Sequence, residues 1–255
     1  MQEGIVNTEI NDGIGIVSFY HPKGNSLSSQ LLSVLTNTIS QIGDDPNVKI
    51  IILKSEGDKV FCAGASFYEL IQIEDEATAQ SFFQGFGNLI NAMKKCPKLI
   101  IGKIQGKAVG GGVGIIAATD YSFATGDAQI KLSELSIGIG PFVVGPAIQR
   151  KLGISAFSQI TLNPDKWFSV NWLCEKGLFT EVVDSIDELD RKVLSFAQRL
   201  KPYSTDAMSE IKKMLWSDTD DWDELLKENA VISARLVLSE ETKNALRKFN
   251  EARKR

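Results

Sequence analysis

The sequence predicts an α/β fold with a parallel sheet, followed by a helical carboxyl-terminal region. Three observations support this prediction. Strand-like and helix-like segments alternate along the first half of the chain, as right-handed parallel crossovers require. The apolar runs at 49–54 and 99–104 are short and bounded by polar residues, which is typical of buried parallel strands. The last 50 residues or so have helical spacing throughout.

The elements of the first half follow from their periodicity. In the first predicted helix, Leu31, Leu35, Ile39 and Ile42 fall on one stripe, as an amphipathic helix requires. The second has the same spacing, with Phe82, Phe86, Leu89 and Met93. In order, we predict a strand over 14–19, a helix over 29–42, a strand over 49–54, a helix over 77–95 and a strand over 99–104.

The second half is mainly helical after one more short strand, which we predict over 181–183. Ser185 and Glu188 have the spacing of a capping box, so a helix begins there, and Pro202 ends it. From Ser204 onward the pattern is helical, with breaks near 217–220 and at Ser239.

Composition excludes several classes of protein. The 255 residues carry a net charge of −4, which argues against broad electrostatic binding of nucleic acid. The single histidine, His21, and three unpaired, widely spaced cysteines leave no multi-histidine or cysteine-rich metal site. No apolar run approaches the length of a membrane span, and Met1–Gly4 shows no start of a signal peptide. We therefore expect a reduced, cytoplasmic protein with no metal.

Two glycine-containing segments are candidates for binding negative charge. Gly110, Gly111 and Gly112 lead into an apolar helical stretch, where backbone N–H groups lack helical partners. The segment 63–65 is a second turn of small residues after a predicted strand. Two converging N–H groups would form an oxyanion hole. The alternatives are close packing of a buried helix, and a dinucleotide-binding pattern over 112–117, whose strand context fits poorly.

Glu134 is an isolated acid among apolar residues. Burial there would raise its pKa and suit it to proton transfer near neutral pH. The alternative is an exposed glutamate on a turn. Taken together, the segments FCAGA at 61–65, GKAVGGG at 106–112, Glu134 and GIGP at 138–141 resemble the crotonase superfamily, the enoyl-CoA hydratase/isomerase family.

The resemblance implies a crotonase-like ββα spiral and an acyl-CoA thioester substrate, with coenzyme A entering as part of the substrate and no other cofactor. It implies that the N–H groups of Ala65 and Gly111 form the oxyanion hole and that Glu134 is the catalytic acid or base. Further residues that the resemblance assigns to substrate binding are Lys23, Ala63, Gly64, Ser66, Gly110, Gly114 and Phe142.

Departures from the family pattern matter for the reaction. Gly114 stands where two-acid hydratases of this family carry their first acid. Phe142 lies where many have a glycine-rich stretch, and Ser66 where many have aspartate, with Glu69 as a nearby reserve acid.

Three functions remain open. We expect hydration of an enoyl-CoA, with a branched substrate such as methylglutaconyl-CoA as one candidate. The first alternative is a Δ3,Δ2-enoyl-CoA isomerase that uses a single glutamate. The second is a crotonase scaffold that binds acyl-CoA without catalysis.

The resemblance also implies an organisation. We expect residues 1–200 to form the spiral core with the CoA-binding and catalytic site. Residues 201–255 would form a helical region that closes the site and mediates oligomerisation. The implied assembly is a homotrimer or a dimer of trimers. From the net charge and the lack of a long apolar run, we expect no nucleic-acid or membrane partner.

Overall fold

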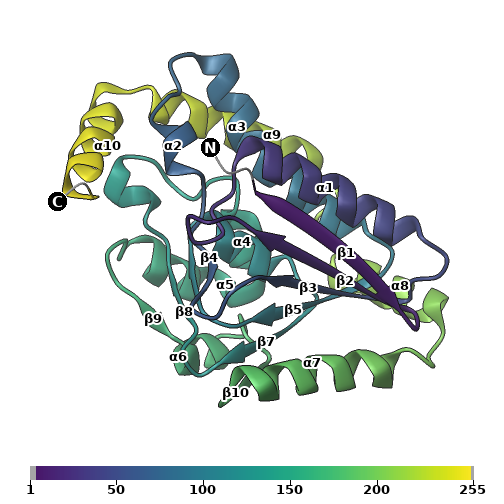
Figure 1. Cartoon of the computed structure of the whole chain (residues 1–255). Helices are drawn as coiled ribbons and strands as arrows, with labels where there is room; N and C mark the ends of the chain where they lie inside the picture. Colours follow the sequence, from purple (N-terminus) through teal and green to yellow (C-terminus); the bar gives the residue numbers. More distant parts are fainter. Residues whose placement is uncertain (1–3, 254–255) are drawn as a thin grey trace.

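Three consecutive strand–strand–helix repeats build the centre of the fold, which the computed structural model describes for residues 4–253 (Figure 1). The start of the chain, on which the expectation about a signal peptide rests, lies outside this range. The repeats comprise β3 (Ile50–Ser55), β4 (Val60–Cys62), α2 (Phe67–Leu70) and α3 (Glu76–Lys95); then β5 (Leu99–Ile104), β6 (Lys107–Val109) and α4 (Gly111–Ala117); then β7 (Tyr121–Thr125), β8 (Gln129–Lys131), the 3-10 helix η1 (Glu134–Ile137) and α5 (Gly145–Thr161).

The repeats are flanked by further elements at both ends. Before them come β1 (Ile5–Asn11), β2 (Ile14–Tyr20) and α1 (Ser29–Asp44). After them come β9 (Phe168–Ser169), α6 (Val170–Glu175), β10 (Glu181–Val183), α7 (Ile186–Leu200), α8 (Thr205–Leu215), α9 (Trp222–Val237) and α10 (Glu240–Arg253).

Each repeat contributes one strand to each of two sheets. The large sheet has the order β1-β2-β3-β5-β7-β10, and only the β1–β2 pair in it is antiparallel. The small sheet has the order β4-β6-β8-β9, with β4, β6 and β8 parallel to one another. This is the ββα spiral that the resemblance implies, so the predicted fold class is confirmed.

Helices cover both faces of the large sheet, as Figure 1 shows. On one face α7 packs against β3, β5 and β7, and buries a cluster that includes Ile52, Phe123 and Leu189. On the other face lies the main core, to which α1, α3, α4 and α9 all contribute. The packing of α3 against α9 joins the middle of the chain to its carboxyl-terminal region. None of the helices in residues 4–253 is both long and apolar enough to cross a membrane.

The predicted elements are confirmed, but several others were not predicted. These are the strands β1, β4, β6, β7, β8 and β9 and the helices α2, α5 and α6. Strands predicted at 14–19, 49–54, 99–104 and 181–183 correspond to β2, β3, β5 and β10, and the helices at 29–42 and 77–95 to α1 and α3. The helix from Ser185 ends at Leu200, and breaks in the later helices fall where predicted. Strands β4, β6 and β8 have three residues each, too few to show an alternating pattern. The division of the chain at residue 200 stays a prediction.

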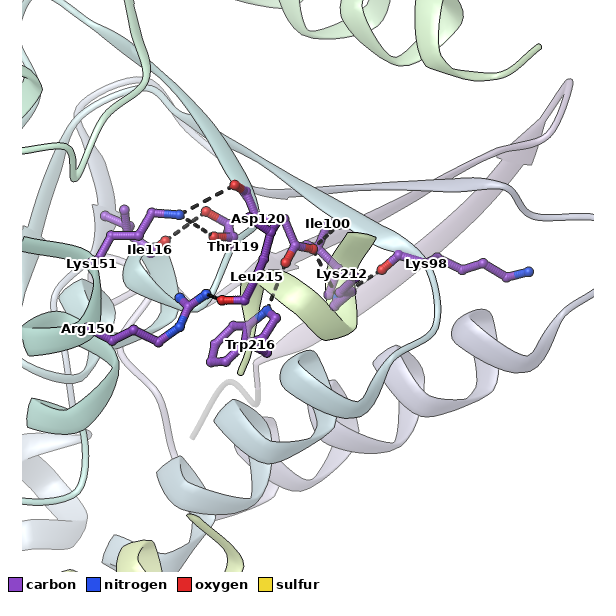
Figure 2. A network of polar contacts seen from close by, with 10 residues as sticks. All are labelled: Lys98, Ile100, Ile116, Thr119, Asp120, Arg150, Lys151, Lys212, Leu215 and Trp216. Carbon is purple, nitrogen blue, oxygen red and sulfur yellow. Dashed lines mark hydrogen bonds and ion pairs between the residues drawn. The ribbon is translucent and has the colours of Figure 1, made fainter. Parts of the chain in front are cut away.

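A buried polar network holds α8 onto the large sheet (Figure 2). The Asp120 carboxylate lies 3.0 Å from the Lys212 ammonium, and both side chains are almost fully buried. Asp120 also accepts hydrogen bonds from the Ile100 N–H at 2.7 Å and the Trp216 indole N–H at 2.9 Å. The Lys212 ammonium donates to the Lys98 carbonyl at 2.9 Å. The charges are therefore paired and hydrogen-bonded, as burial requires.

Removing one partner of this pair should destabilise the protein strongly. Asp120→Asn leaves the Lys212 ammonium buried without its counter-charge, so we expect a loss of about 3–5 kcal/mol in the free energy of unfolding. Lys213→Met is the matched control, because Lys213 pairs with Glu210 on the exposed side of the same helix and should cost less than about 1 kcal/mol. Denaturant unfolding measures both. Equal losses for the two variants would show that the buried pair contributes no more to stability than the exposed one.

Candidate active site

A cavity of about 680 Å³ lies beyond the carboxyl ends of β4, β6 and β8. The three segments singled out in the sequence follow these neighbouring parallel strands directly, because Ala63 follows β4, Gly110 follows β6 and Glu134 comes shortly after β8. The sequence-predicted residues that line the cavity are Ala63, Gly64, Ala65, Gly110, Gly111, Glu134 and Phe142.

The turn after β4 presents one backbone donor. Leu27 donates its N–H to the Gly64 carbonyl and accepts from the Ser66 N–H, both at 2.8 Å. These bonds bracket Ala65, whose own N–H has no acceptor within the described part of the chain. Gly64 has φ of +87°, and a Cβ there would lie 2.8 Å from the Val109 carbonyl oxygen, so the turn requires glycine.

The turn after β6 presents a second donor beside the first. Gly110 has φ of +52° and ψ of −119°, a conformation open only to glycine, and donates its N–H to the Lys131 carbonyl at 2.9 Å. Gly111 begins α4, and its N–H has no acceptor among residues 4–253. A Cβ built on Gly64 would lie 3.8 Å from this nitrogen, so the two turns are in contact.

Glu134 places its carboxyl group against the same turn. A Cβ on Gly110 would lie 2.8 Å from Glu134 Oε1, so the absence of a side chain there lets the carboxyl approach. The residue as a whole is half-buried, but Oε2 is shielded from solvent and has no hydrogen-bond partner within the described chain. This desolvation raises the pKa of Glu134 to about 7. The carboxyl is thus suited to exchange a proton near neutral pH.

The apolar end of the cavity includes Phe86 and Val144, which contact the glycines of α4. A Cβ on Gly111 would meet the Phe86 ring at 2.2 Å, and one on Gly114 would meet Val144 Cβ at 2.6 Å. Val144 itself lines the cavity, whereas Gly114 is buried and does not. The space in which a side chain at position 114 would begin is therefore filled by Val144.

Three residues assigned to binding by resemblance lie outside the cavity lining: Lys23, Ser66 and Gly114. Lys23 is exposed on a loop whose Gly24 packs near Ala63. Ser66 is buried and caps α2, accepting a hydrogen bond from the Glu69 N–H. The Glu69 carboxylate accepts from the N–H and hydroxyl of Ser29 at 2.9 and 2.7 Å, so it serves the start of α1.

Sequence reasoning missed the lining residues that come from distant segments. Asp165 and Trp167 lie on the loop before β9, Ser233 comes from α9, and Lys248 and Phe249 come from α10. Nothing in their local pattern signals a shared cavity, because α10 reaches it through long-range packing. Thr242 of α10 is fully buried and donates its hydroxyl to the Gly138 carbonyl at 3.1 Å, just after η1. Across residues 4–253, no three His, Cys, Asp or Glu side chains gather as a metal site requires.

Comparison with known proteins gives a consistent result. Residues 9–255 match the family model described as enoyl-CoA hydratase/isomerase. A probable enoyl-CoA hydratase of Bacillus subtilis is 25% identical over 251 residues, which cover 98% of this chain and 96% of the relative. Human mitochondrial methylglutaconyl-CoA hydratase is 30% identical over 210 residues, 78% of this chain and 60% of the relative. The crystal structure of an enoyl-CoA hydratase from Bacillus halodurans superposes with a TM-score of 0.89 at 21% identity, covering 95% of this chain and 99% of the other.

The raised pKa of Glu134 predicts how its replacement affects stability. The folded state holds the carboxyl proton up to about pH 7, whereas the unfolded chain releases it near its ordinary value of 4.5. Stability therefore falls as pH rises through this window. The free energy of unfolding of Glu134→Gln should exceed that of the wild type by up to about 3 kcal/mol at pH 8, and the variant should have no such advantage at pH 4. Urea unfolding at both pH values, with the exposed Glu228→Gln as control, measures this. A difference that does not depend on pH would contradict it.

The contact between Gly114 and Val144 predicts a steric penalty at position 114. Gly114→Ala should cost about 1–3 kcal/mol of stability, because the new methyl group meets Val144. Gly126→Ala is the control, since its nearest neighbour would lie 4.0 Å away. In a double-mutant cycle, Gly114→Ala with Val144→Gly should cost less than the two single changes together. Additive costs would show that the two positions do not compete for space.

Proposed function

Because this chain belongs to the enoyl-CoA hydratase/isomerase family of the crotonase superfamily, we propose that it moves a proton between carbon atoms of an enoyl-CoA thioester. The reaction is the interconversion of 3-enoyl and 2-enoyl thioesters. The main observation that supports this proposal concerns the carboxylates of the cavity. Among the described residues that line it, only Glu134 has a buried carboxylate oxygen without a hydrogen-bond partner. The other lining carboxylate, Asp165, is exposed to solvent.

The proposed steps use the groups of the site in turn. The thioester oxygen accepts hydrogen bonds from the N–H groups of Ala65 and Gly111, which have no other acceptor among the described residues. Ionised Glu134 takes a proton from C2, and the resulting negative charge spreads onto the thioester oxygen as a dienolate. The protonated Glu134 then returns the proton to C4, and the double bond moves from C3–C4 to C2–C3. Preorganised donors of this kind are worth about 3–4 kcal/mol each in the transition state.

Hydration is the second candidate function, and there are specific observations both for it and against it. The relatives described above carry the names of hydratases, including one for methylglutaconyl-CoA, which supports the addition of water to an enoyl-CoA. Against it, Val144 fills the space at Gly114, so no second acid from α4 can hold a water across from Glu134. A one-acid proton shuttle needs no such partner. For this reason we prefer isomerisation to hydration, although the sequence favoured hydration.

Three expectations about this protein remain predictions. The homotrimer or dimer of trimers follows from the family resemblance alone, and so does coenzyme A, carried by the substrate, as the only cofactor-derived group. The cytoplasmic location rests on the unpaired cysteines and the composition of the chain.

Product analysis separates the three functions. With 3-hexenoyl-CoA, isomerisation yields the conjugated 2-hexenoyl-CoA of equal mass, which ultraviolet absorbance follows. With crotonyl-CoA, hydration adds the mass of one water. We expect fast conversion of the first substrate and slow hydration of the second. The reverse result would overturn our preference, and tight binding without turnover of either thioester would favour a non-catalytic scaffold.

Glu134→Gln should lower kcat by about 10²–10⁴-fold, because the proton carrier is lost. The matched control is Asp165→Asn, which changes the other carboxylate of the cavity and should retain most activity. In the wild type, kcat/KM should rise with pH and reach half its maximum near pH 7, since the reaction starts from ionised Glu134. A larger loss in Asp165→Asn than in Glu134→Gln would assign the chemistry to Asp165.

A further inference from the structure

Two lysines flank one tryptophan at the cavity and lack acidic partners. The Lys131 ammonium lies 4.9 Å from the centre of the Trp167 ring, and the Lys107 ammonium lies 5.1 Å from it. None of the ion pairs described for residues 4–253 involves either lysine, and neither ammonium group donates a hydrogen bond within this range. Asp165, on the same loop as Trp167, forms no ion pair with them. The cluster is thus a concentration of unneutralised positive charge.

Strand geometry puts the cluster on one side of the small sheet. Lys131 pairs directly with Val109 across the parallel strands β8 and β6. Because alternate residues of a strand face the same side, Lys107 shares the face of Val109 and Lys131. Since both ammonium groups lie about 5 Å from one ring centre, they are at most about 10 Å apart. That is no more than about one Debye length, so the like charges repel each other.

One of the two lysines belongs to the cavity. Lys131 and Trp167 both line it, whereas Lys107 is exposed beside it. Lys131 is half-buried, so its charge is less screened by water than that of a surface lysine. An anion in the cavity would give this ammonium a charge-assisted hydrogen bond and would relieve its repulsion with Lys107.

The position of Lys131 decides which part of a thioester it can reach. Its carbonyl accepts the Gly110 N–H at 2.9 Å, next to the proposed oxyanion donor Gly111, and it precedes Glu134 by three residues. Its backbone therefore lies beside the turn that carries the proposed oxyanion donor, and its side chain extends from there to Trp167 in the cavity lining. The phosphates of coenzyme A are separated from the thioester by the whole pantetheine arm, whereas the acyl group begins at the thioester itself.

We propose that Lys131, seated on Trp167 and supported by Lys107, binds a carboxylate at the far end of the substrate's acyl group. The preferred substrate class is thus the CoA thioester of a dicarboxylic acid. This inference rests on the proposed use of the cavity for acyl-CoA, but it concerns binding and not the type of reaction. Phe86 and Val144 contact the hydrocarbon part of the chain.

Binding of saturated thioesters tests the proposal without turnover. Glutaryl-CoA and adipoyl-CoA are titrated calorimetrically against pentanoyl-CoA and hexanoyl-CoA, which differ from them only in the terminal group. Wild type should bind the dicarboxylic thioesters more tightly. Lys131→Met should weaken the binding of the dicarboxylic thioesters by about tenfold or more, which corresponds to the loss of one charge-assisted hydrogen bond. It should change the affinities for pentanoyl-CoA and hexanoyl-CoA by less than about twofold. Lys131→Arg should retain part of the preference.

Lys176→Met is the matched control, because Lys176 lies over Trp172 in a similar contact away from the cavity. It should leave all four affinities unchanged. Equal weakening of both classes by Lys131→Met would assign the lysine to the phosphates of coenzyme A and overturn the proposal. Unchanged affinities would also overturn it, as would a change of oligomeric state or melting temperature that accounts for the loss. Because the probes cannot isomerise, a failure of the proposed reaction would leave this result standing.

Discussion

The parallel pairing of β4, β6 and β8 is the constraint on which the site depends. Parallel strands end at a common edge, so the segments after them are brought together whatever their separation along the chain. The hydrogen bond from the Gly110 N–H to the Lys131 carbonyl continues this pairing by one step, past the end of β6. On the β4 side, the close approach of Gly64 to Val109 holds the turn after β4 against the end of β6. Both backbone donors and the carboxyl of Glu134 are therefore set by main-chain geometry.

Backbone geometry of this kind explains why glycine recurs where side chains would otherwise be expected. At Gly64 and Gly110 the positive φ values and the neighbouring atoms exclude a Cβ, and at Gly110 the freed space is occupied by Glu134. The carboxyl loses water contacts as a result, and burial raises its pKa toward neutrality. The same packing that builds the proposed oxyanion site therefore also adjusts the proposed proton carrier. Val144, which also lines the cavity, fills with hydrocarbon the space next to Gly114.

The sequence was sufficient for some of the spiral's longer elements, though not for helix α5 or strand β7, and for most of the candidate site, but for different reasons. Helix α1 has a clear helical stripe, and strands β3 and β5 are short apolar runs, so the local sequence is enough to predict them. The turns at Ala65 and Gly111 were singled out by their small residues after predicted strands, the resemblance then assigned their roles, and they do line the cavity. Lys131, Trp167 and Phe249 could not be found this way. Their place depends on the register of three-residue strands and on the docking of α10, neither of which leaves a local pattern.

The site is closed by the end of the chain, which gives the fold a long-range dependence. The η1 turn that carries Glu134 has only four residues and too few internal hydrogen bonds to define its position. The Gly138 N–H donates to the Glu134 and Leu135 carbonyls of this turn, and the Gly138 carbonyl in turn accepts the Thr242 hydroxyl of α10. Phe249 of the same helix packs on Phe67 of α2, with ring centres 5.1 Å apart. The helix thus bridges the two turns across the cavity. The proposed proton carrier and one proposed oxyanion donor are held relative to each other by a segment more than 100 residues away in the sequence, so the candidate site is complete only when α10 has docked.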